Sequence, residues 1–375
     1  MTAWLVDGVR TPIGRFRGRL SDRSAVDLGI TAATVLRERH GADAVNRSVM
    51  GNVLQASGGQ NPARQVVVGA GFDPRTYGLT LNDVCLSSMT AVGLAADAVG
   101  PRDEAWLVGG MDSMSRADRP IDGPDTPTVV VHDGLTCALE STVHGTVADR
   151  DDARLGITRS DADAFAFRSF TRAAEATASG FLAGEQVPVI TDDGLFDQDE
   201  GLRDTSLERL AGLSPAFTPD GTVTPGNASQ MSDGAAVGIV AGDAWVQRRG
   251  VTPLARVVGT AAVAGVGGSL HEMPALAVER LLAEQGVAVG NVDVWEVNEA
   301  FAGVVLASCR RLGVSPEAVN VHGGAIAVGH PLAASGFRLV LTLARSLHAL
   351  GARRGVATMC GGGGQGAAVL LETVA

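Results

Sequence analysis

The sequence contains no lysine, so all 30 of its basic residues are arginines, and 41 acidic residues outnumber them. The resulting net charge of -11 argues against a nucleic-acid partner, because nucleic-acid binding requires a basic surface. No stretch approaches the roughly 18 consecutive apolar residues of a membrane-spanning helix, so we expect no membrane span. These two absences exclude two large classes of function.

Cysteine is also scarce. The four cysteines, Cys85, Cys137, Cys309 and Cys360, lie far apart and form no C-x-x-C pair. No secretory leader precedes the opening residues MTAWLVDGVR, so the sequence predicts neither a disulfide framework nor a zinc site. We therefore expect free thiols, no metal and a cytoplasmic location.

The pattern of apolar residues predicts an α/β protein. With 375 residues, 45% hydrophobic and 19% charged, the chain can bury a large core and form more than one domain. Short apolar runs alternate with longer helical patterns, as where AWLVDGV is followed by SAVDLGITAATVLRERH. We expect a layered fold whose sheet is buried on both faces.

The middle of the chain interrupts this alternation. Residues 115–134 are rich in Pro, Asp and Arg, and a predicted helix follows them, with Ser160 as its N-cap and Asp163 as the capping-box partner. The alternation resumes at NASQMSDGAAVGIVAG. We therefore expect two similar halves, each with an apolar strand that breaks into glycines, separated by an insertion. The predicted parts are residues 1–115, completed by about 231–252, an inserted loop domain at 116–230, and a second half at 253–375.

Cys85 is the first candidate for chemistry. It follows the run TLNDV and precedes a helical pattern with apolar positions at Leu86, Met89, Val92, Ala96 and Val99. A thiol at a helix N-terminus meets N–H donors and the positive end of the helix dipole, which lower its pKa and populate the thiolate. Cys85 could be a nucleophile on this basis, or a buried cysteine without a chemical role.

Three further residues could act with such a thiol. His330 follows a glycine-rich segment and precedes Pro331 at the start of a helical stretch, so its imidazole could face a cleft and accept a proton. Cys360 ends the run GVATM and precedes four glycines, which allow a substrate to approach the backbone, although it could be a plain strand cysteine. Asn298 follows VDVWEV and opens a predicted helix, where it could be a cap, a catalytic amide or both.

In this order, the segments NDVCLSSMTAV, VNEAF, NVHGGAIAVGHPLAASG and MCGGGGQGAAVLLE resemble the signature blocks of the thiolase family. Other thiolase-like segments, VMGNVLQASGGQNPARQ, GGMDSMS, DGLT and GTVTPGNASQMSDGAA, fill the intervals, so the resemblance covers nearly the whole chain. It implies a five-layered α-β-α-β-α fold of two similar halves with an inserted loop domain. It also implies an acyltransferase that acts on 3-ketoacyl-CoA and CoA.

The resemblance implies a role for each candidate. Cys85 is acylated, and His330 activates it. Cys360 is the acid and base at the α-carbon of the second substrate. The N–H groups of Gly362 and Cys85 form one oxyanion hole, and Asn298 holds a water that forms the second with His330. No metal and no tightly bound cofactor is implied, since CoA and acyl-CoA are substrates.

The same matching suggests contacts to CoA. It assigns Arg203 to the nucleotide, Ser229 to the pantetheine amides and Phe301 to the pantetheine channel. An acidic protein that binds a polyanion needs such local positive charge. An ordinary surface arginine is the alternative for Arg203.

Three positions depart from the family pattern. His144 stands where the family usually has methionine in Met-Gly-Thr, and Cys137 stands where an aspartate is common. Both fall in the segment that covers the acyl pocket, so the sequence does not predict the acyl-chain specificity. His322 replaces a usual asparagine and either alters a hydrogen bond or is simply packed.

The sequence thus predicts an acetyl-CoA C-acyltransferase of fatty acid metabolism, acting on acetoacetyl-CoA or another 3-ketoacyl-CoA. It should be a homodimer, because the segment 116–132, where thiolases commonly carry a tetramerisation loop, is short. The alternatives are a degradative thiolase for long or unusual acyl chains and a non-catalytic CoA- or lipid-binding relative. Cys360 speaks against a decarboxylating ketosynthase, which uses histidines around its cysteine. The run GGGGQG has no acidic residue some twenty positions on, which argues against a dinucleotide site.

Overall fold

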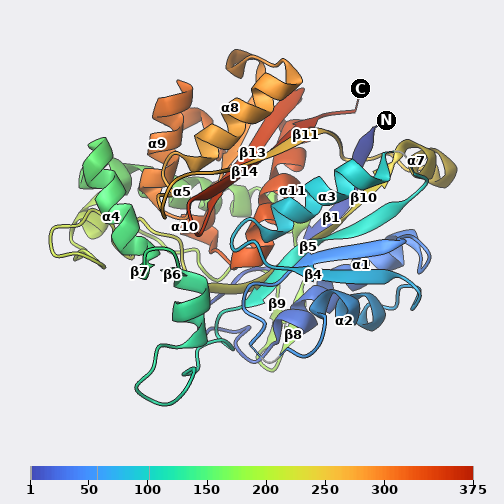
Figure 1. Ribbon diagram of the computed structural model, residues 1–375, viewed down its shortest axis with the longest axis horizontal. Helices are drawn as coiled ribbons and strands as arrows, with labels where there is room; N and C mark the ends of the chain where they lie inside the picture. Colours follow the sequence, from blue (N-terminus) through green and yellow to red (C-terminus); the bar gives the residue numbers. More distant parts are fainter. Residues whose placement is uncertain (1, 57, 101, 375) are drawn as a thin grey trace.

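The computed structural model describes residues 2–56, 58–100 and 102–374. A ten-stranded mixed sheet runs through it in the order β12-β13-β14-β11-β1-β10-β5-β3-β4, with β2 paired to β10 (Figure 1). Its strands are β1 (Ala3–Arg10), β2 (Gly14–Arg15), β3 (Arg47–Gly51), β4 (Tyr77–Leu81), β5 (Ala105–Ser113), β10 (Ser232–Gly242), β11 (Ala255–Ala264), β12 (Val294–Val297), β13 (Arg354–Gly361) and β14 (Gln365–Glu372).

The sheet consists of two halves with matching strand order. The series β3-β5-β10-β1 in the first half corresponds to β12-β13-β14-β11 in the second. In both series the first pair of strands is parallel and the next two pairs are antiparallel. The halves join where β1 pairs antiparallel with β11. The expectation of two similar α/β halves is therefore confirmed.

The register of the parallel pairs defines which residues are equivalent. The last partners are Gly51 and Gly110 in the first half, and Val297 and Thr358 in the second. One residue beyond the first strand of each pair, Asn52 therefore corresponds to Asn298. Two residues beyond the last paired residue of the second strand, Asp112 corresponds to Cys360.

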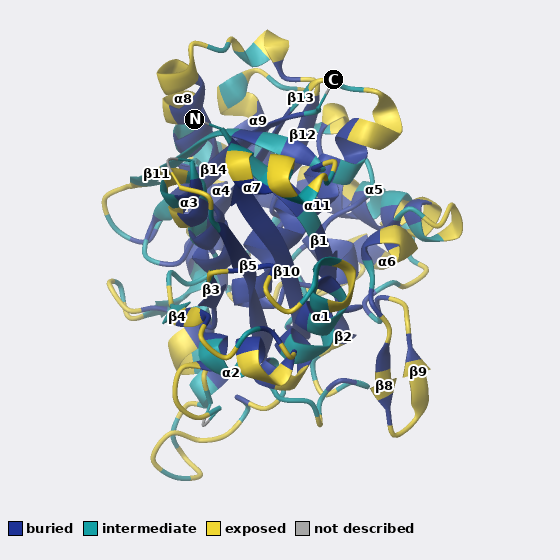
Figure 2. Cartoon of the chain, turned by 90° about the vertical axis from the view of Figure 1, so that its right-hand side faces the viewer, coloured by how far each residue is buried: buried dark blue, intermediate teal, exposed yellow. Residues whose placement is uncertain are grey.

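Helices enclose both half-sheets and fill the space between them (Figure 1). Helices α3 (Ser87–Val99) and α11 (Leu332–Leu350) share one buried apolar cluster with strands of both halves. Helices α1 (Ala25–His40) and α2 (Pro62–Gly69) cover the outer face of the first half, while α5 (Arg159–Ala178), α8 (Met273–Gln285) and α9 (Ala302–Leu312) cover that of the second. This is the expected five-layered arrangement, and Figure 2 shows the central strands buried beneath the helices.

The segment between β5 and β10 forms two small sheets and three helices. The sheets pair β6 (Thr136–Cys137) with β7 (Thr142–Val143), and β8 (Val189–Thr191) with β9 (Gly194–Phe196), the latter a projecting hairpin in Figure 2. The helices are α4 (His144–Leu155), α5 and α6 (Leu207–Ala211). Two short helices lie elsewhere, α7 (Asp243–Arg249) and α10 (Ala325–Val328). None of the helices in the described part of the chain has the length and apolarity that crossing a bilayer requires.

The predicted start of α5 is wrong by two residues. The N-cap is Thr158, whose hydroxyl accepts from the N–H of Asp161, and the Asp161 carboxylate accepts from the N–H of Thr158 in return. Asp163 instead accepts hydrogen bonds from Arg159 and Asn227. The motif Thr-x-x-Asp begins two residues before Ser-x-x-Asp, and the chain uses the earlier one.

A buried ion cluster fastens the insertion to the sheet. Arg10, at the end of β1, is 1% exposed and donates two parallel hydrogen bonds to Asp199, at 2.7 and 2.8 Å. Its Nε donates to Glu185 at 2.7 Å. The Asp199 carboxylate also accepts from the N–H of Ile13. One guanidinium therefore satisfies two carboxylates from the insertion.

Replacing Asp199 by alanine should destabilise the protein by about 3–5 kcal/mol, because the buried Arg10 charge would lose its bidentate partner. The matched control is Asp103→Ala, which removes an exposed carboxylate paired with Arg248 and should cost less than about 1 kcal/mol. Urea unfolding followed by circular dichroism measures both changes. Equal losses in the two variants would contradict this account.

Candidate active site

A strained turn presents Cys85 at the start of α3. Val84 has φ of 48°, a left-handed conformation that a β-branched residue adopts only under strain. The Ser87 hydroxyl holds the turn, because it donates to the Val84 carbonyl at 2.6 Å and accepts from the N–H of Asp83 at 2.9 Å. The thiol therefore has a fixed direction. The predicted apolar stripe of this helix is buried, apart from the half-buried Ala96.

The environment of the thiol corrects one expectation. Burial raises the pKa of Cys85 to about 12, and the negative charge of Asp112 adds to this, whereas the N–H of Gly362 donates to the sulfur and acts in the opposite direction. Removal from water thus outweighs the helix N-terminus, which we expected to lower the pKa. The resting residue is a thiol, so its nucleophilic form requires a base.

His330 has the properties of such a base. Its Nδ1 lies 2.5 Å from the Ser335 hydroxyl, and that hydroxyl donates its own proton to the Pro331 carbonyl at 2.8 Å. Ser335 must therefore accept from Nδ1–H, which leaves the lone pair of the neutral imidazole on Nε2. Burial, with a contribution from the positive charge of Arg338, lowers the pKa of His330 to about 3.

Asn298 lies beside this lone pair. Its Nδ2 is 3.4 Å from Nε2 of His330, and its Oδ1 is buried without a hydrogen-bond partner among the described residues. Its N–H donates to the carbonyl of Thr358, two residues before Cys360. Helix α9 begins at Ala302 with Phe301 as N-cap, so the reading of Asn298 as a helix cap is wrong.

Cys360 completes this group of side chains. It is 2% exposed, and burial raises its thiol pKa, as does the nearby Cys85. The glycine turn that follows has φ of 79° at Gly363 and 71° at Gly364. A Cβ atom at Gly361 would be 2.5 Å from Leu86, so only glycine lets this strand approach the start of α3. Gly362 and Cys360 therefore lie near the Cys85 sulfur, while Asn298 lies beside His330.

Asp112 joins the loop after β3 to the start of α11, and its role was not predicted from the sequence. One carboxylate oxygen accepts from the N–H groups of Val53 and Leu54 and from Asn52, at 2.9–3.1 Å. The other accepts from the N–H of Ala333, in the first turn of α11, at 2.7 Å. Burial raises its pKa to about 6. A carboxylate inside a buried strand, in GGMDSMS, is the signal that could have revealed it.

Two buried ionisable side chains, Glu296 and Arg338, were also missed. Burial raises the pKa of Glu296 to about 8, while the charge of Arg338 lowers it. Burial likewise lowers the pKa of Arg338 below its usual value.

Glu299, the neighbour of Asn298, accepts hydrogen bonds from Ser169, Asn320 and the N–H of Ile326. The hydrogen bonds of Glu299 tie the segment that carries Asn298 to the segment that leads to His330.

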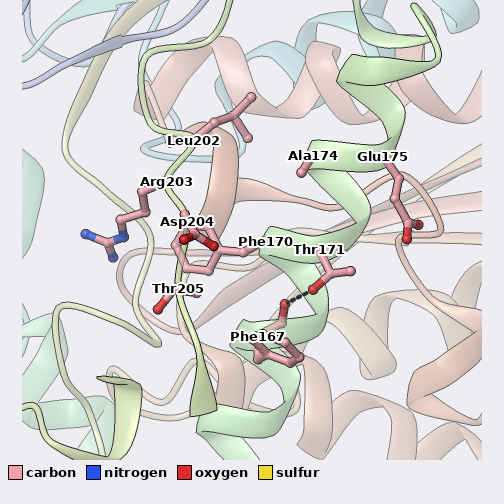
Figure 3. Close-up of a pocket in the computed structure, with 9 residues that line it drawn as sticks. All are labelled: Phe167, Phe170, Thr171, Ala174, Glu175, Leu202, Arg203, Asp204 and Thr205. Atoms are coloured by element: carbon pink, nitrogen blue, oxygen red, sulfur yellow. Dashed lines mark hydrogen bonds between the residues drawn. The ribbon is translucent and has the colours of Figure 1, made fainter. Parts of the chain in front are cut away.

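Arg203 lies at a surface cavity apart from the two cysteines. The cavity has a volume of about 510 Å³ and lies between α5 and residues 202–205 (Figure 3). The Arg203 guanidinium lies 4.9 Å from the centre of the Phe170 ring and donates to the carbonyl of Pro225 at 2.8 Å. Burial lowers its pKa below the usual value, but an arginine remains a cation.

Ser229 and Phe301 lie on neighbouring segments. The N–H of Ser229 donates to the carbonyl of Ala300, and Ala228 forms a bridge with Phe301. Phe301 packs on the apolar cluster that contains Cys360. Phe301 is therefore near Cys360, and Ser229 lies on the segment beside it.

The three departures from the family pattern have different surroundings. His322 stacks on Phe181, with ring centres 3.6 Å apart, which favours the packed reading. Cys137 is buried against the backbone of Gly268. His144 lies against Gly362. Over the described residues, no group of three or more His, Cys, Asp or Glu side chains is arranged to hold a metal.

Comparison with known proteins agrees with this geometry. Residues 3–243 match the model of the thiolase N-terminal domain, and residues 251–373 match that of the thiolase C-terminal domain. The probable acetyl-CoA acetyltransferases of Mycobacterium leprae and Mycobacterium tuberculosis are each 42% identical, over 100% and 99% of both chains respectively. The acetyl-CoA acetyltransferase of Escherichia coli is 40% identical over 98% of both chains. The chain therefore belongs to the thiolase family of acyltransferases.

Proposed function

We propose that this protein is an acetyl-CoA acetyltransferase, which exchanges acyl groups between 3-ketoacyl-CoA and CoA through an acyl-cysteine on Cys85. The observation that carries the proposal is the meeting of a half-buried thiol, a backbone N–H directed at its sulfur and a second, buried thiol nearby. The names of the relatives, all of similar length, point to the same reaction.

The first half-reaction needs a nucleophile and a base. Nε2 of His330 accepts the Cys85 proton, and the thiolate attacks the keto carbon of the substrate. The N–H groups of Gly362 and Cys85 stabilise the negative charge that develops on the oxygen. When the carbon-carbon bond breaks, its electron pair passes to the α-carbon, and Cys360 supplies the proton that releases acetyl-CoA.

The second half-reaction transfers the acyl group to CoA. The CoA thiol gives up its proton to the Cys360 thiolate, attacks the acyl-cysteine and expels Cys85, which regains the proton held by His330. We assign Asn298 and His330 to stabilising the negative charge on the oxygen of the acetyl-CoA enolate, which departs in the first half-reaction. In the reverse direction Cys360 removes the α-proton of acetyl-CoA, and the resulting enolate attacks the acyl-enzyme in a Claisen condensation.

The binding of CoA is assigned to the surface around Arg203. Its cationic guanidinium is available for a phosphate group, with Ser229 and Phe301 along the path to the cysteines. We also propose a cytoplasmic role in fatty acid metabolism. One alternative is a degradative thiolase, whose preferred substrates would carry long or unusual acyl chains. The other is a non-catalytic CoA-binding protein, which would cleave no ketoacyl-CoA.

Substituting each cysteine separates the half-reactions. Cys85→Ala should abolish acyl-enzyme formation. Cys360→Ala should still take an acetyl group from acetyl-CoA, while thiolysis of acetoacetyl-CoA falls about 10²–10⁴-fold, since a positioned acid-base group is lost. Mass spectrometry after brief exposure to acetyl-CoA, with thiolysis assays over ketoacyl-CoAs of graded length, measures both.

The matched control for this pair is Cys309→Ala, a buried cysteine on α9 that should leave both half-reactions intact. Normal acylation of the Cys85 variant, or near-full thiolysis by the Cys360 variant, would refute the two-cysteine assignment. An unmodified protein that cleaves no ketoacyl-CoA but binds CoA would be a binding protein.

The protonation states predict a particular pH dependence for Cys85. With a thiol pKa of about 12 and a His330 pKa of about 3, the resting pair is uncharged at neutral pH. The thiolate fraction, and with it the rate of alkylation by iodoacetamide, should rise about tenfold per pH unit from pH 6 to 9. Peptide mapping of the alkylated Cys85 gives the rate, and a plateau above about pH 7 would reveal a preformed thiolate.

A homodimer is the proposed assembly. Strand β4 lies at one edge of the sheet and exposes Tyr77 and Leu79, and an uncovered edge strand favours pairing with a second chain. The segment 116–132 is short, which supports a dimer over a tetramer. Light scattering at micromolar concentration should give twice the chain mass of 38.3 kDa, and a stable tetramer would disprove the reasoning from the loop.

A further inference from the structure

His144, the first residue of α4, lies over the glycine turn next to the reactive cysteines. A Cβ atom added to Gly362 would be 3.0 Å from Nε2 of His144 and 3.1 Å from Cγ1 of Val84. Gly362 is the residue whose N–H donates to the Cys85 sulfur. The imidazole therefore lies beside the group that will hold the thioester oxygen.

The side chains around this imidazole are mostly apolar. Val84 contacts the same point of Gly362, and Leu139 reaches the neighbouring Gly363. Cys360 is packed in an apolar cluster with Leu270 and Met273. The imidazole of His144 is thus a polar group among apolar side chains that would otherwise suit a plain alkyl chain.

The hydrogen bonding of His144 indicates which nitrogen carries the proton. Nδ1 is buried without a hydrogen-bond partner among the described residues. A buried N–H that lacks an acceptor is more costly than a buried lone pair, so the proton belongs on Nε2, the nitrogen that faces Gly362. Burial lowers the pKa of His144, although the Glu140 carboxylate opposes this, so the ring is uncharged at neutral pH. His144 therefore offers one neutral N–H donor to the site.

Given the acyl transfer proposed above, we infer that the Nε2–H of His144 donates a hydrogen bond to the acyl chain. The preferred substrates are then 3-ketoacyl-CoA molecules with an additional uncharged oxygen, a hydroxyl or a second keto group, a few atoms beyond the ketone. A plain alkyl chain would displace water from this N–H donor without accepting a hydrogen bond from it. The unpaired donor would then weaken the binding of the plain substrate.

The charges nearby favour an uncharged oxygen over a carboxylate. Glu140 lies close enough to raise the pKa of His144, and Arg150 already neutralises it through a 2.6 Å hydrogen bond. The arginine is therefore engaged, and the imidazole itself brings no positive charge. An anionic acyl chain would therefore meet no unpaired cation among the side chains of Glu140, Arg150 and His144.

The test compares substrates of equal length: 3-ketohexanoyl-CoA, its 5-hydroxy derivative, and 3-ketoadipoyl-CoA with its terminal carboxylate. Thiolysis by CoA gives kcat/KM for each. The unmodified enzyme should favour the hydroxylated substrate over the plain one by about 10-fold or more, the effect of one hydrogen bond. His144→Met should abolish or reverse this ratio, and His144→Gln, which keeps an N–H donor, should retain part of it.

The matched control is His132→Met, which changes an exposed histidine and should leave the ratio as it is. A ratio near one in the unmodified enzyme, or an unchanged ratio in His144→Met, would overturn the inference. A preference for the carboxylate substrate would overturn the choice of an uncharged oxygen. Acetoacetyl-CoA, assayed in parallel with the unmodified enzyme, distinguishes the cases: if it is not cleaved, the proposed function fails, and if it is cleaved without a hydroxyl preference, only the role of His144 fails.

Discussion

The carboxylate of Asp112 is the contact on which the arrangement of the site depends. It accepts four hydrogen bonds, from three donors in the segment 52–54 and from the first turn of α11. His330 stands three residues before the N–H that Asp112 binds, so the position of the base follows from this contact. With a pKa raised only to about 6, the carboxylate is ionised at neutral pH, and hydrogen bonds to a charged acceptor are the strong ones. Its negative charge also helps to keep the Cys85 thiol protonated.

Burial then decides the protonation of every reacting group. Both thiols and the imidazole are enclosed by the apolar residues of the layered fold, and in each case burial is the largest cause of the pKa shift. An uncharged thiol and an uncharged imidazole are the result, so charge appears only as the reaction proceeds. Fixed dipoles, such as the N–H of Gly362, are worth most in such an environment, because no solvent has to reorganise around the developing charge.

Periodicity and glycine placement predicted an α/β fold of two similar halves, because they are expressed locally in the sequence, whereas the five layers and the grouping of side chains around Cys85 were implied by the resemblance to thiolases. It did not predict the start of α5, where two overlapping capping motifs compete, or the conformation of Asn298, which precedes its helix by several residues. The ionisation of Cys85 was predicted in the wrong direction. A helix N-terminus is visible in the sequence, but the depth of burial that opposes it depends on residues far along the chain. Asp112, Glu296 and Arg338 were missed for the same reason, because their partners are distant in sequence.

The duplicated architecture explains why these particular residues meet. Asp112 and Cys360 occupy equivalent positions on β5 and β13, as do Asn52 and Asn298 after β3 and β12. In the first half, Asn52 and Asp112 hold the start of α11, the helix that follows His330. In the second half, Asn298 and Cys360 stand beside His330 and Cys85 instead. The sequences GAAV after Asp233 and GAAV after Gln365 carry the same correspondence in the next strand of each half. One half thus uses an asparagine and an acidic side chain to position a helix, and the other uses the equivalent positions for chemistry. The hydrogen bonds of the first pair position the helix that follows His330, so the thiol of Cys360 is left free of a structural partner and able to give and take a proton.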